Sequence, residues 1–447
     1  MTSIEVFDAT YHKNSLDAIV EAGESCSMDD EREDAPEGIR RVMSTSTVTQ
    51  QASQTQRSSR GYRIESVDVL RGLLMLLMAI DHARDYFTSV AIDPADPVHS
   101  WPVLFFTRWI THLCAPGFVL LAGTSVYLQR QRKSAATLTR ALILRGLWLI
   151  ALEVTVVGFG WSFGFGMPIF QVIWVIGVSM IVLAGLQWLP LPVVGAFGVI
   201  VVFGHNLLDR IHAARLGEWS DAWYIFHERG LLTFHGHPVA VYGYPVIPWV
   251  GVMALGYCFG WVVVKAPEVR QRISVITGVA SLGLFALLRL MHGYGDPGPG
   301  FKHLGTLGHT VMSFFSVQKY PPSLHYLLAT LGVVLLLFAL FDRVVLADRL
   351  DRVRSFMNVY GRVPFFFYIA HIFVIHALAL GVAFLTNPNW RFWITPDAVF
   401  TRHFDGWGYS LPVVYLVWGF VVLALYPLCA WFSGLKDRRR DWWLAYL

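Results

Sequence analysis

The chain alternates between apolar runs of membrane-spanning length and short polar connections. A helix that crosses the hydrocarbon core of a bilayer needs roughly 20 residues. We therefore expect an all-α fold, a polytopic integral membrane helix bundle with about ten transmembrane helices. The predicted spans lie near residues 66–87, 102–128, 137–158, 168–188, 191–207, 245–264, 272–291, 323–341, 363–385 and 411–432.

The first apolar run differs from a plain membrane anchor because it carries ionisable residues along its length. At about 100° per residue, Asp68, Arg71, His82 and Asp85 fall within about one third of the helix circumference. Asp68 and His82 lie roughly 21 Å apart along the axis. Ionisable groups at membrane depth usually face the protein interior and often mark function. The run therefore predicts one polar stripe between the two sides of the membrane.

Composition supports the membrane class and narrows the functions. Of the 447 residues, 55% are hydrophobic and only 15% are charged, against about 25% charged in a soluble domain. The net charge of +4 gives no reason to expect nucleic-acid binding. The four cysteines form no CxxC pair, so we expect no metal site.

Basic connections predict the orientation in the membrane. Cytoplasmic loops are enriched in Lys and Arg, so both termini are expected in the cytoplasm and the longer loops 208–244, 292–322 and 386–410 outside. We expect three regions: a disordered cytoplasmic tail (1–60), a membrane-embedded domain (61–435) and a basic cytoplasmic tail (436–447). The basic connections are Arg130–Lys133, Lys265–Arg272, Asp342–Arg354 and Lys436–Arg440.

The second span offers partners for the charges of the first. Arg108 and His112 are four residues apart and share a helix face, at about the depth of His82 and Asp85. Two interpretations stay open: an ion-pair network that locks two helices, or a site in which a histidine is a general base. In the second, Asp81 or Asp85 orients the histidine and Arg108 stabilises an oxyanion.

Further candidates lie at the two membrane surfaces. His99 precedes the second span on the outer side, and Lys319 and Tyr320 stand at the outer mouth of the eighth span, where they could meet a substrate. On the cytoplasmic side, Arg71, Arg140 and Arg145 suit the phosphates of a nucleotide-like donor, although basic residues there also fit the ordinary orientation signal. Other polar residues within spans suggest a polar cavity through the bundle: Glu153, Gln171, Arg289, His371 and His376.

Several motifs resemble the catalytic domain family of heparan-α-glucosaminide N-acetyltransferase, in particular its bacterial members. The resemblance covers most of residues 63–435. The motifs are SVDVLRG (Ser66–Gly72), LLMAIDH (Leu76–His82), THLCAPGFVLLAG (Thr111–Gly123), MPIFQVIWVIG (Met167–Gly177) and KYPPSL (Lys319–Leu324).

The resemblance implies a multi-helix membrane enzyme that takes acetyl from cytoplasmic acetyl-CoA and delivers it to an amino sugar on the far side. Related membrane acyltransferases modify hydroxyls of envelope glycans. It also implies that Arg71 and its neighbours, Asp68 among them, contact the donor. The nearest counterpart of the family's active histidine is His99.

Together these observations predict a transmembrane acyltransferase of the bacterial inner membrane, with acetyl-CoA as co-substrate, no metal, and a sugar or glycan as acceptor. A histidine, His82, His112 or His99, is expected to be the general base or to carry the acyl group briefly. The expected partners of the chain are the lipid bilayer and the acceptor, and a homo-oligomer of the chain stays open. A secondary transporter, which needs the same intramembrane charges, is the alternative. We find no internal repeat of the kind that transporters usually show.

Overall fold

A computed structural model describes residues 64–447 except 236, 299, 396–403, 440, 442–443 and 445–447. The predicted tail 1–60 therefore lies outside the described residues. The predicted helical membrane bundle is confirmed, and each of the ten predicted spans contains a helix. The helices assigned to spans are α3 (Glu65–Phe87), α4 (Pro102–Thr111) with α5 (Cys114–Arg130), α6 (Ala135–Leu152), α8 (Val172–Leu186), α9 (Leu191–Gly204), α11 (Val246–Val263), α12 (Pro267–Leu290), α14 (Leu324–Leu346), α16 (Pro364–Thr386) and α18 (Leu411–Arg438).

Within the described residues, eight of these spans are long and apolar enough to cross a membrane, counting α4 and α5 as one. The other two differ for physical reasons. Helix α3 is long enough but carries six charged residues, and α8 has only 15 residues. The first residues of the predicted basic tail, from Lys436, belong to the last turn of α18.

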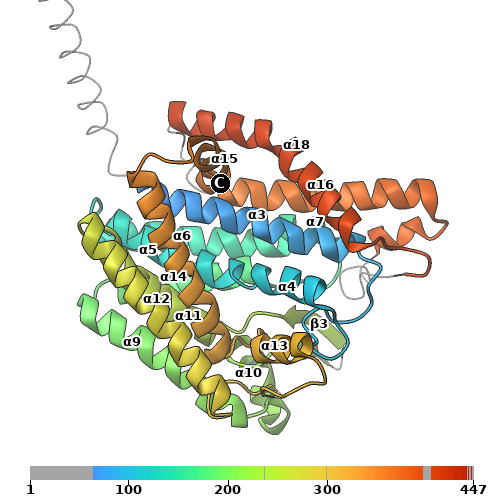
Figure 1. Ribbon diagram of the computed structural model, residues 1–447, viewed down its shortest axis with the longest axis horizontal. Coiled ribbons are helices and arrows are strands. Elements are labelled where there is room, and N and C mark those ends of the chain that lie inside the picture. The colour runs from blue at the N-terminus through green and yellow to red at the C-terminus, as the bar shows by residue number, and fades with distance from the viewer. Residues whose placement is uncertain are drawn as a thin grey trace, which may run out of the picture. The chain divides into compact units, whose positions relative to one another are not determined.

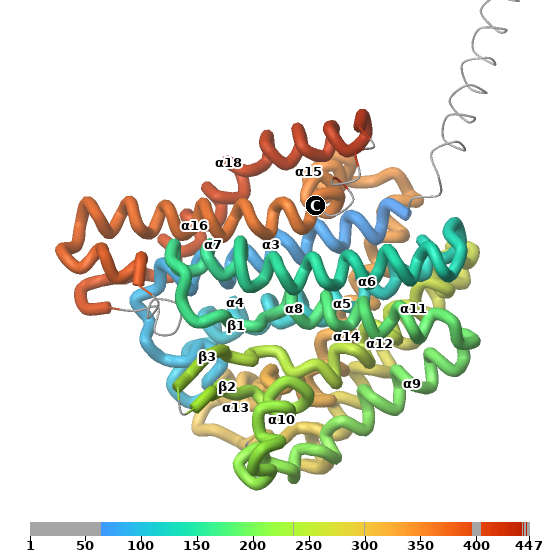
Figure 2. Tube along the Cα trace, turned by 180° about the vertical axis from the view of Figure 1, so that it is seen from behind, coloured from blue at the N-terminus to red at the C-terminus, as the bar shows by residue number. Residues whose placement is uncertain are grey.

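Helix α3 lies at the centre of the bundle. It packs against α4, α5, α14, α16 and α18, and against α15 (Asp351–Arg362), a helix that we did not expect in the connection after the eighth span. Figure 1 shows α3 in blue crossing the middle of the bundle, and Figure 2 shows α6 and α8 on the opposite face. Sixteen of the 23 residues of α3 are buried. The charged run is thus surrounded by protein rather than lipid.

Helix α12 illustrates the opposite position, at the edge of the bundle. Its buried residues are mostly small or polar, such as Ser274 and Gly278, while Ile276, Val279 and Leu290 are each more than half exposed. This pattern is the reverse of that in a soluble protein. It suits a helix whose outer surface faces lipid, where small residues let neighbouring helices approach closely.

The basic connections gather at one end of the bundle. Asp342 of α14 accepts two hydrogen bonds from Arg270 of α12, at 2.7 and 2.9 Å, and one from Ser66 of α3 at 3.0 Å. Glu65 pairs with Arg354 of α15 at 2.9 Å. The segments around Lys133 and Lys436 meet α15 at the groove described below.

The loops at the other end contain short elements that were not predicted. A three-stranded sheet has the order β1 (Ile169–Phe170), β3 (His237–Tyr242) and β2 (Gly230–Phe234), with β1 parallel and β2 antiparallel to β3. Two short helices accompany it, α10 (Ser220–Phe226) and α13 (Leu307–Phe315). Strands of two to six residues are too short to stand out from a loop by periodicity alone.

The close approach of α3 and α15 generates a testable prediction. A methyl group added at Gly72 would lie 1.9 Å from the carbonyl oxygen of Met357, and one at Gly361 would lie 1.8 Å from that of Asp68. Gly72→Ala and Gly361→Ala should each destabilise the protein by about 1–3 kcal/mol, as overpacking does. The measurement is the thermal midpoint in detergent.

Gly283→Ala is the matched control, because a methyl group there has no neighbour within 4 Å. This change should leave the midpoint unchanged or raise it slightly, since Ala favours a helix over Gly. Equal midpoints for all three variants would show that α3 and α15 do not pack this tightly.

Candidate functional site

A polar cavity of about 150 Å³, here called the inner chamber, lies against the C-terminal half of α3. Met78, Asp81, His82 and Asp85 of α3 line it, and at about 100° per residue they fall within about 100° of the helix circumference. Thr111 and Ala115 add the wall from α4 and α5. The remaining polar side chains around it come from distant parts of the chain: Arg108, Gln171, Tyr244, Lys319, Tyr320 and Tyr368.

The acids of the chamber are paired with arginines. Arg108 of α4 forms an ion pair and hydrogen bond with Asp81. Arg84 lies 2.8 Å from a carboxylate oxygen of Asp81 and 2.8 Å from one of Asp85. Two carboxylates and two guanidinium groups therefore balance in charge, which compensates the cost of removing each from water. The structure brings Asp85, which we expected at about the depth of Arg108, into one cluster with Asp81, Arg84 and Arg108.

His82 is joined to His371 of α16, with 2.6 Å between His82 Nδ1 and His371 Nε2. On its other side, His371 Nδ1 lies 2.8 Å from the carbonyl oxygen of Phe367. A carbonyl only accepts, so His371 Nδ1 carries a proton and, in the neutral ring, Nε2 accepts from His82. The hydrogen bonds thus assign the tautomer of His82: Nδ1 is protonated and Nε2 carries the lone pair.

The other two candidate histidines lie outside the chamber lining. His112 sits where α4 ends and α5 begins, is 4% exposed, and packs its ring against Tyr326 at 5.5 Å. The side chain of His99 is 68% exposed and its Nδ1 lies 2.5 Å from Asp96. This hydrogen bond holds the pKa of Asp96 below its usual range.

A larger cavity of about 560 Å³, here called the basic groove, opens at the end of the bundle where the basic connections gather. Arg71 is held in it by hydrogen bonds to Asp68 at 2.9 Å, to Ser125 at 3.0 Å and to the carbonyl of Gly361 at 3.1 Å. Arg140 is exposed and does not line the groove. The basic residues that line it are Arg71, Lys133, Arg145, Arg362 and Lys436.

The groove and the chamber adjoin. Met78, Phe118, Val172 and Tyr368 line both. Three of these four side chains are apolar. We call the region that they line, between the groove and the chamber, the apolar passage.

The polar residues that were expected to form one cavity have separate places. Gln171 lines the chamber and His371 bonds to His82, as described above. Glu153 accepts the backbone N–H of Trp174 at 2.9 Å and so caps the start of α8. Arg289 of α12 pairs at 2.6 Å with Asp296 of the loop that follows, and His376 bonds to backbone carbonyls of Gly160 and Trp393.

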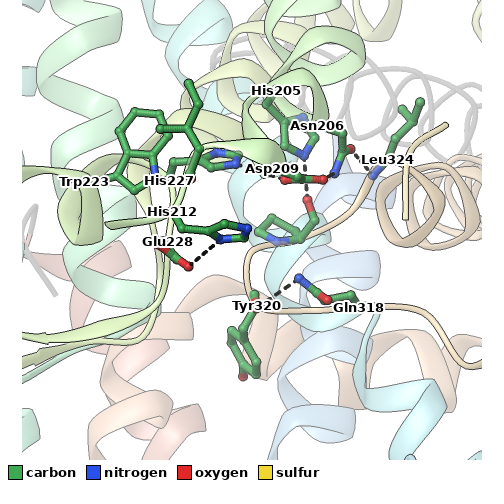
Figure 3. A network of polar contacts seen from close by, with 12 residues as sticks. His205, Asn206, Asp209, His212, Trp223, His227, Glu228, Gln318, Tyr320 and Leu324 are labelled. Atoms are coloured by element: carbon green, nitrogen blue, oxygen red, sulfur yellow. Dashed lines mark hydrogen bonds and ion pairs between the residues drawn. The ribbon is translucent and has the colours of Figure 1, made fainter. Parts of the chain in front are cut away.

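A hydrogen-bond network holds the loop that brings Lys319 and Tyr320 to the chamber. His205 Nε2 lies 2.8 Å from the carbonyl of Pro322, and Asn206 accepts the backbone N–H of Leu324 at 2.9 Å. Asp209 in turn lies 2.7 Å from Asn206 and 3.0 Å from His227 (Figure 3). No spacing along the chain predicts this network, because its members come from segments that are far apart in the sequence.

Comparison with known proteins adds one match. No curated protein matches the chain. The model of the family described as heparan-alpha-glucosaminide N-acetyltransferase, catalytic, matches residues 63–291, which is more than half of the 447 residues. The matched part runs from the start of α3 to the end of α12 and includes both arginines and both acids of the chamber. The chain therefore belongs to the heparan-alpha-glucosaminide N-acetyltransferase catalytic family, a family of transmembrane acetyltransferases.

Proposed function

We propose that the protein transfers an acetyl group from acetyl-CoA in the cytoplasm to an amine or hydroxyl of a sugar or glycan on the other side of the membrane. The single observation that carries this proposal is the junction of the basic groove with the inner chamber. One space suits a phosphorylated donor and the other holds a histidine with a defined tautomer. Family membership supports the acetyl group as cargo.

The proposal places the donor in the basic groove. Arginine forks bind phosphates through paired, charge-assisted hydrogen bonds, and Arg71 and Arg145 line the groove together with Lys133, Arg362 and Lys436. Asp68 serves by holding Arg71. The pantetheine arm of CoA is slender and mostly uncharged, so it suits the passage past Met78 and Phe118. The thioester would then lie in the chamber.

In the proposed reaction His82 is the general base. The acceptor's nitrogen or oxygen attacks the thioester carbon, the carbonyl electrons move to oxygen, and His82 Nε2 takes the acceptor's proton. The tetrahedral intermediate then collapses, the C–S bond breaks, and the CoA thiolate takes the proton from His82. His371 is a positioning residue that fixes the tautomer of His82 through Nδ1. It takes the orienting role that we had expected of Asp81 or Asp85.

The same proposal fixes the orientation. The basic end of the bundle faces the cytoplasm by the positive-inside rule, which puts both termini there and the His-rich loops outside. The membrane would be the bacterial cytoplasmic membrane, and residues 61–435 would act as one membrane-embedded unit between two tails.

Donor binding can be tested by substitution in the groove. Arg71→Gln and Arg145→Gln should each weaken CoA binding roughly 10- to 100-fold, because a hydrogen bond to a charged group contributes about 1.5–3 kcal/mol. The measurement is the CoA-dependent rise of the thermal midpoint of the purified protein. Arg140→Gln is the matched control and should bind CoA like the wild type. Equal binding by all three variants would place the donor elsewhere.

The base can be identified from thiol release. Purified protein in lipid, given acetyl-CoA and a mixture of amino sugars and glycans, should release CoA thiol only when acceptor is present. His82→Gln should lower kcat roughly 100- to 10,000-fold, the usual contribution of general base catalysis, and leave CoA-dependent stabilisation intact.

His99→Gln tests the alternative that the family resemblance suggested. Its side chain is mostly exposed and outside the chamber, so this variant should keep wild-type turnover. Loss of turnover in His99→Gln with full turnover in His82→Gln would move the chemistry to the outer loop. No thiol release by the wild type with any acceptor would contradict acetyl transfer and favour a transporter.

A further inference from the structure

The loop between α13 and α14 contributes two polar side chains to the inner chamber whose role the proposed reaction leaves open. Lys319 and Tyr320 both line the chamber together with Arg108. The ammonium nitrogen of Lys319 lies 5.1 Å from the centre of the Tyr320 ring. The hydroxyl of Tyr320 lies 3.4 Å from that of Tyr244.

Lys319 carries a positive charge that the chamber's acids do not balance. Asp81 and Asp85 are already paired with Arg84 and Arg108. Among the described residues, no carboxylate forms an ion pair with Lys319. The chamber thus holds one positive charge in excess. A negative charge that develops inside it is stabilised, because a charge is screened less within a protein than in bulk water.

Tyr320 is prepared to donate a strong hydrogen bond. Burial raises the pKa of its hydroxyl, but the nearby Lys319 and Arg108 outweigh burial and lower the pKa to about 8. Arg229 also lies 5.5 Å from the ring centre. The titratable and charged groups that face Tyr320 or share its chamber are Lys319, Arg108, Arg229, Tyr244, Tyr326, Tyr368, Cys114, Asp81, Asp85 and His82.

The loop is fixed on both sides of these two residues. Before them, the backbone N–H of Gln318 donates to Asp296 at 3.2 Å. After them, His205 and Asn206 hold Pro322 and Leu324 through the network of Figure 3. Donors that are already in position when charge develops need no rearrangement in the transition state, which is what makes such groups effective.

We propose that Lys319 and Tyr320 are catalytic residues that, with Arg108, form an oxyanion site across the chamber from His82. The proposal rests on acetyl transfer as described above. When the acceptor attacks the thioester carbon, the carbonyl oxygen becomes negatively charged. It receives hydrogen bonds from the Tyr320 hydroxyl and the Lys319 ammonium while His82 holds the acceptor's proton. When the carbonyl re-forms and the C–S bond breaks, both donors keep their protons.

Tyr320→Phe and Lys319→Met test the oxyanion site. Tyr320→Phe should lower kcat roughly 100- to 1,000-fold, as removal of one oxyanion donor does, with little change in the KM for acetyl-CoA. Lys319→Met should lower kcat as well, and Lys319→Arg should restore part of it because the positive charge returns. Tyr294→Phe and Lys302→Met, from exposed outer positions, are matched controls that should keep wild-type turnover.

The pH profile separates this role from a structural one. Tyr320 donates only while it is protonated, so kcat of the wild type should fall as pH rises through about 8. This fall should be absent in Tyr320→Phe. In Lys319→Met it should move to higher pH, because a cation that lowers the pKa of Tyr320 is gone. If Tyr320→Phe does not fold, 3-fluorotyrosine at this position, a more acidic ring, should move the fall to lower pH.

The outcomes distinguish the two proposals. Thiol release by the wild type together with unchanged kcat and an unchanged pH profile in Tyr320→Phe and Lys319→Met would overturn the oxyanion site and leave acetyl transfer standing. An unchanged pH profile of kcat in the protein with 3-fluorotyrosine at position 320 would also overturn the oxyanion site. No thiol release by the wild type would overturn both.

Discussion

The cost of removing charge from water governs the architecture of this protein. Helix α3 carries six charged residues across a space where an unpaired charge costs several kcal/mol. Each must meet an opposite charge or several hydrogen-bond partners, some on α3 itself and the others on neighbouring helices. Asp81 needs Arg108 of α4, Arg71 needs Ser125 of α5 and the carbonyl of Gly361 in α15, and Ser66 shares Asp342 with Arg270. The central place of α3 follows from these requirements.

Because one helix serves both spaces, the two halves of the proposed reaction are mechanically linked. Arg71 in the basic groove and His82 in the inner chamber are eleven residues apart on α3, three turns of one rigid element. The distance between the site for the donor's phosphates and the site for its thioester would therefore be set by one helix. Loops at the end of the bundle opposite the basic connections supply the remaining groups, held by His205 and Asn206.

Much of this arrangement could be predicted because it follows from local spacing. The length of the apolar runs predicted the membrane spans. Helical periodicity predicted that His82 and Asp85 share a helix face with Arg71. The same periodicity separates Arg140 from Arg145 by about 140° around α6, which agrees with Arg140 lying outside the groove. His112 is different: it shares a four-residue spacing with Arg108, but α4 ends between them and its ring turns toward Tyr326.

What could not be predicted depends on contacts between distant segments. His371 lies 289 positions from His82, and no local pattern in α16 marks it as a partner. Lys319 and Tyr320 were recognised at the outer mouth of a span, but their approach to Arg108 depends on a loop whose anchors come from the region after α9. Sequence spacing describes one helix at a time, whereas a site in a bundle is assembled from several.

The apolar passage between groove and chamber has a consequence for the energetics of the cell. An energised membrane stays useful only while protons cannot run through it, and a continuous file of water beside ionisable groups would conduct them. Met78, Phe118 and Val172 interrupt the polar path where the two spaces meet, and apolar constrictions lose their water readily. An acetyl group carried on a flexible arm can pass such a constriction, while a hydrated proton cannot. In the proposed reaction, acetyl groups would leave one compartment while the electrochemical gradient across the membrane is kept.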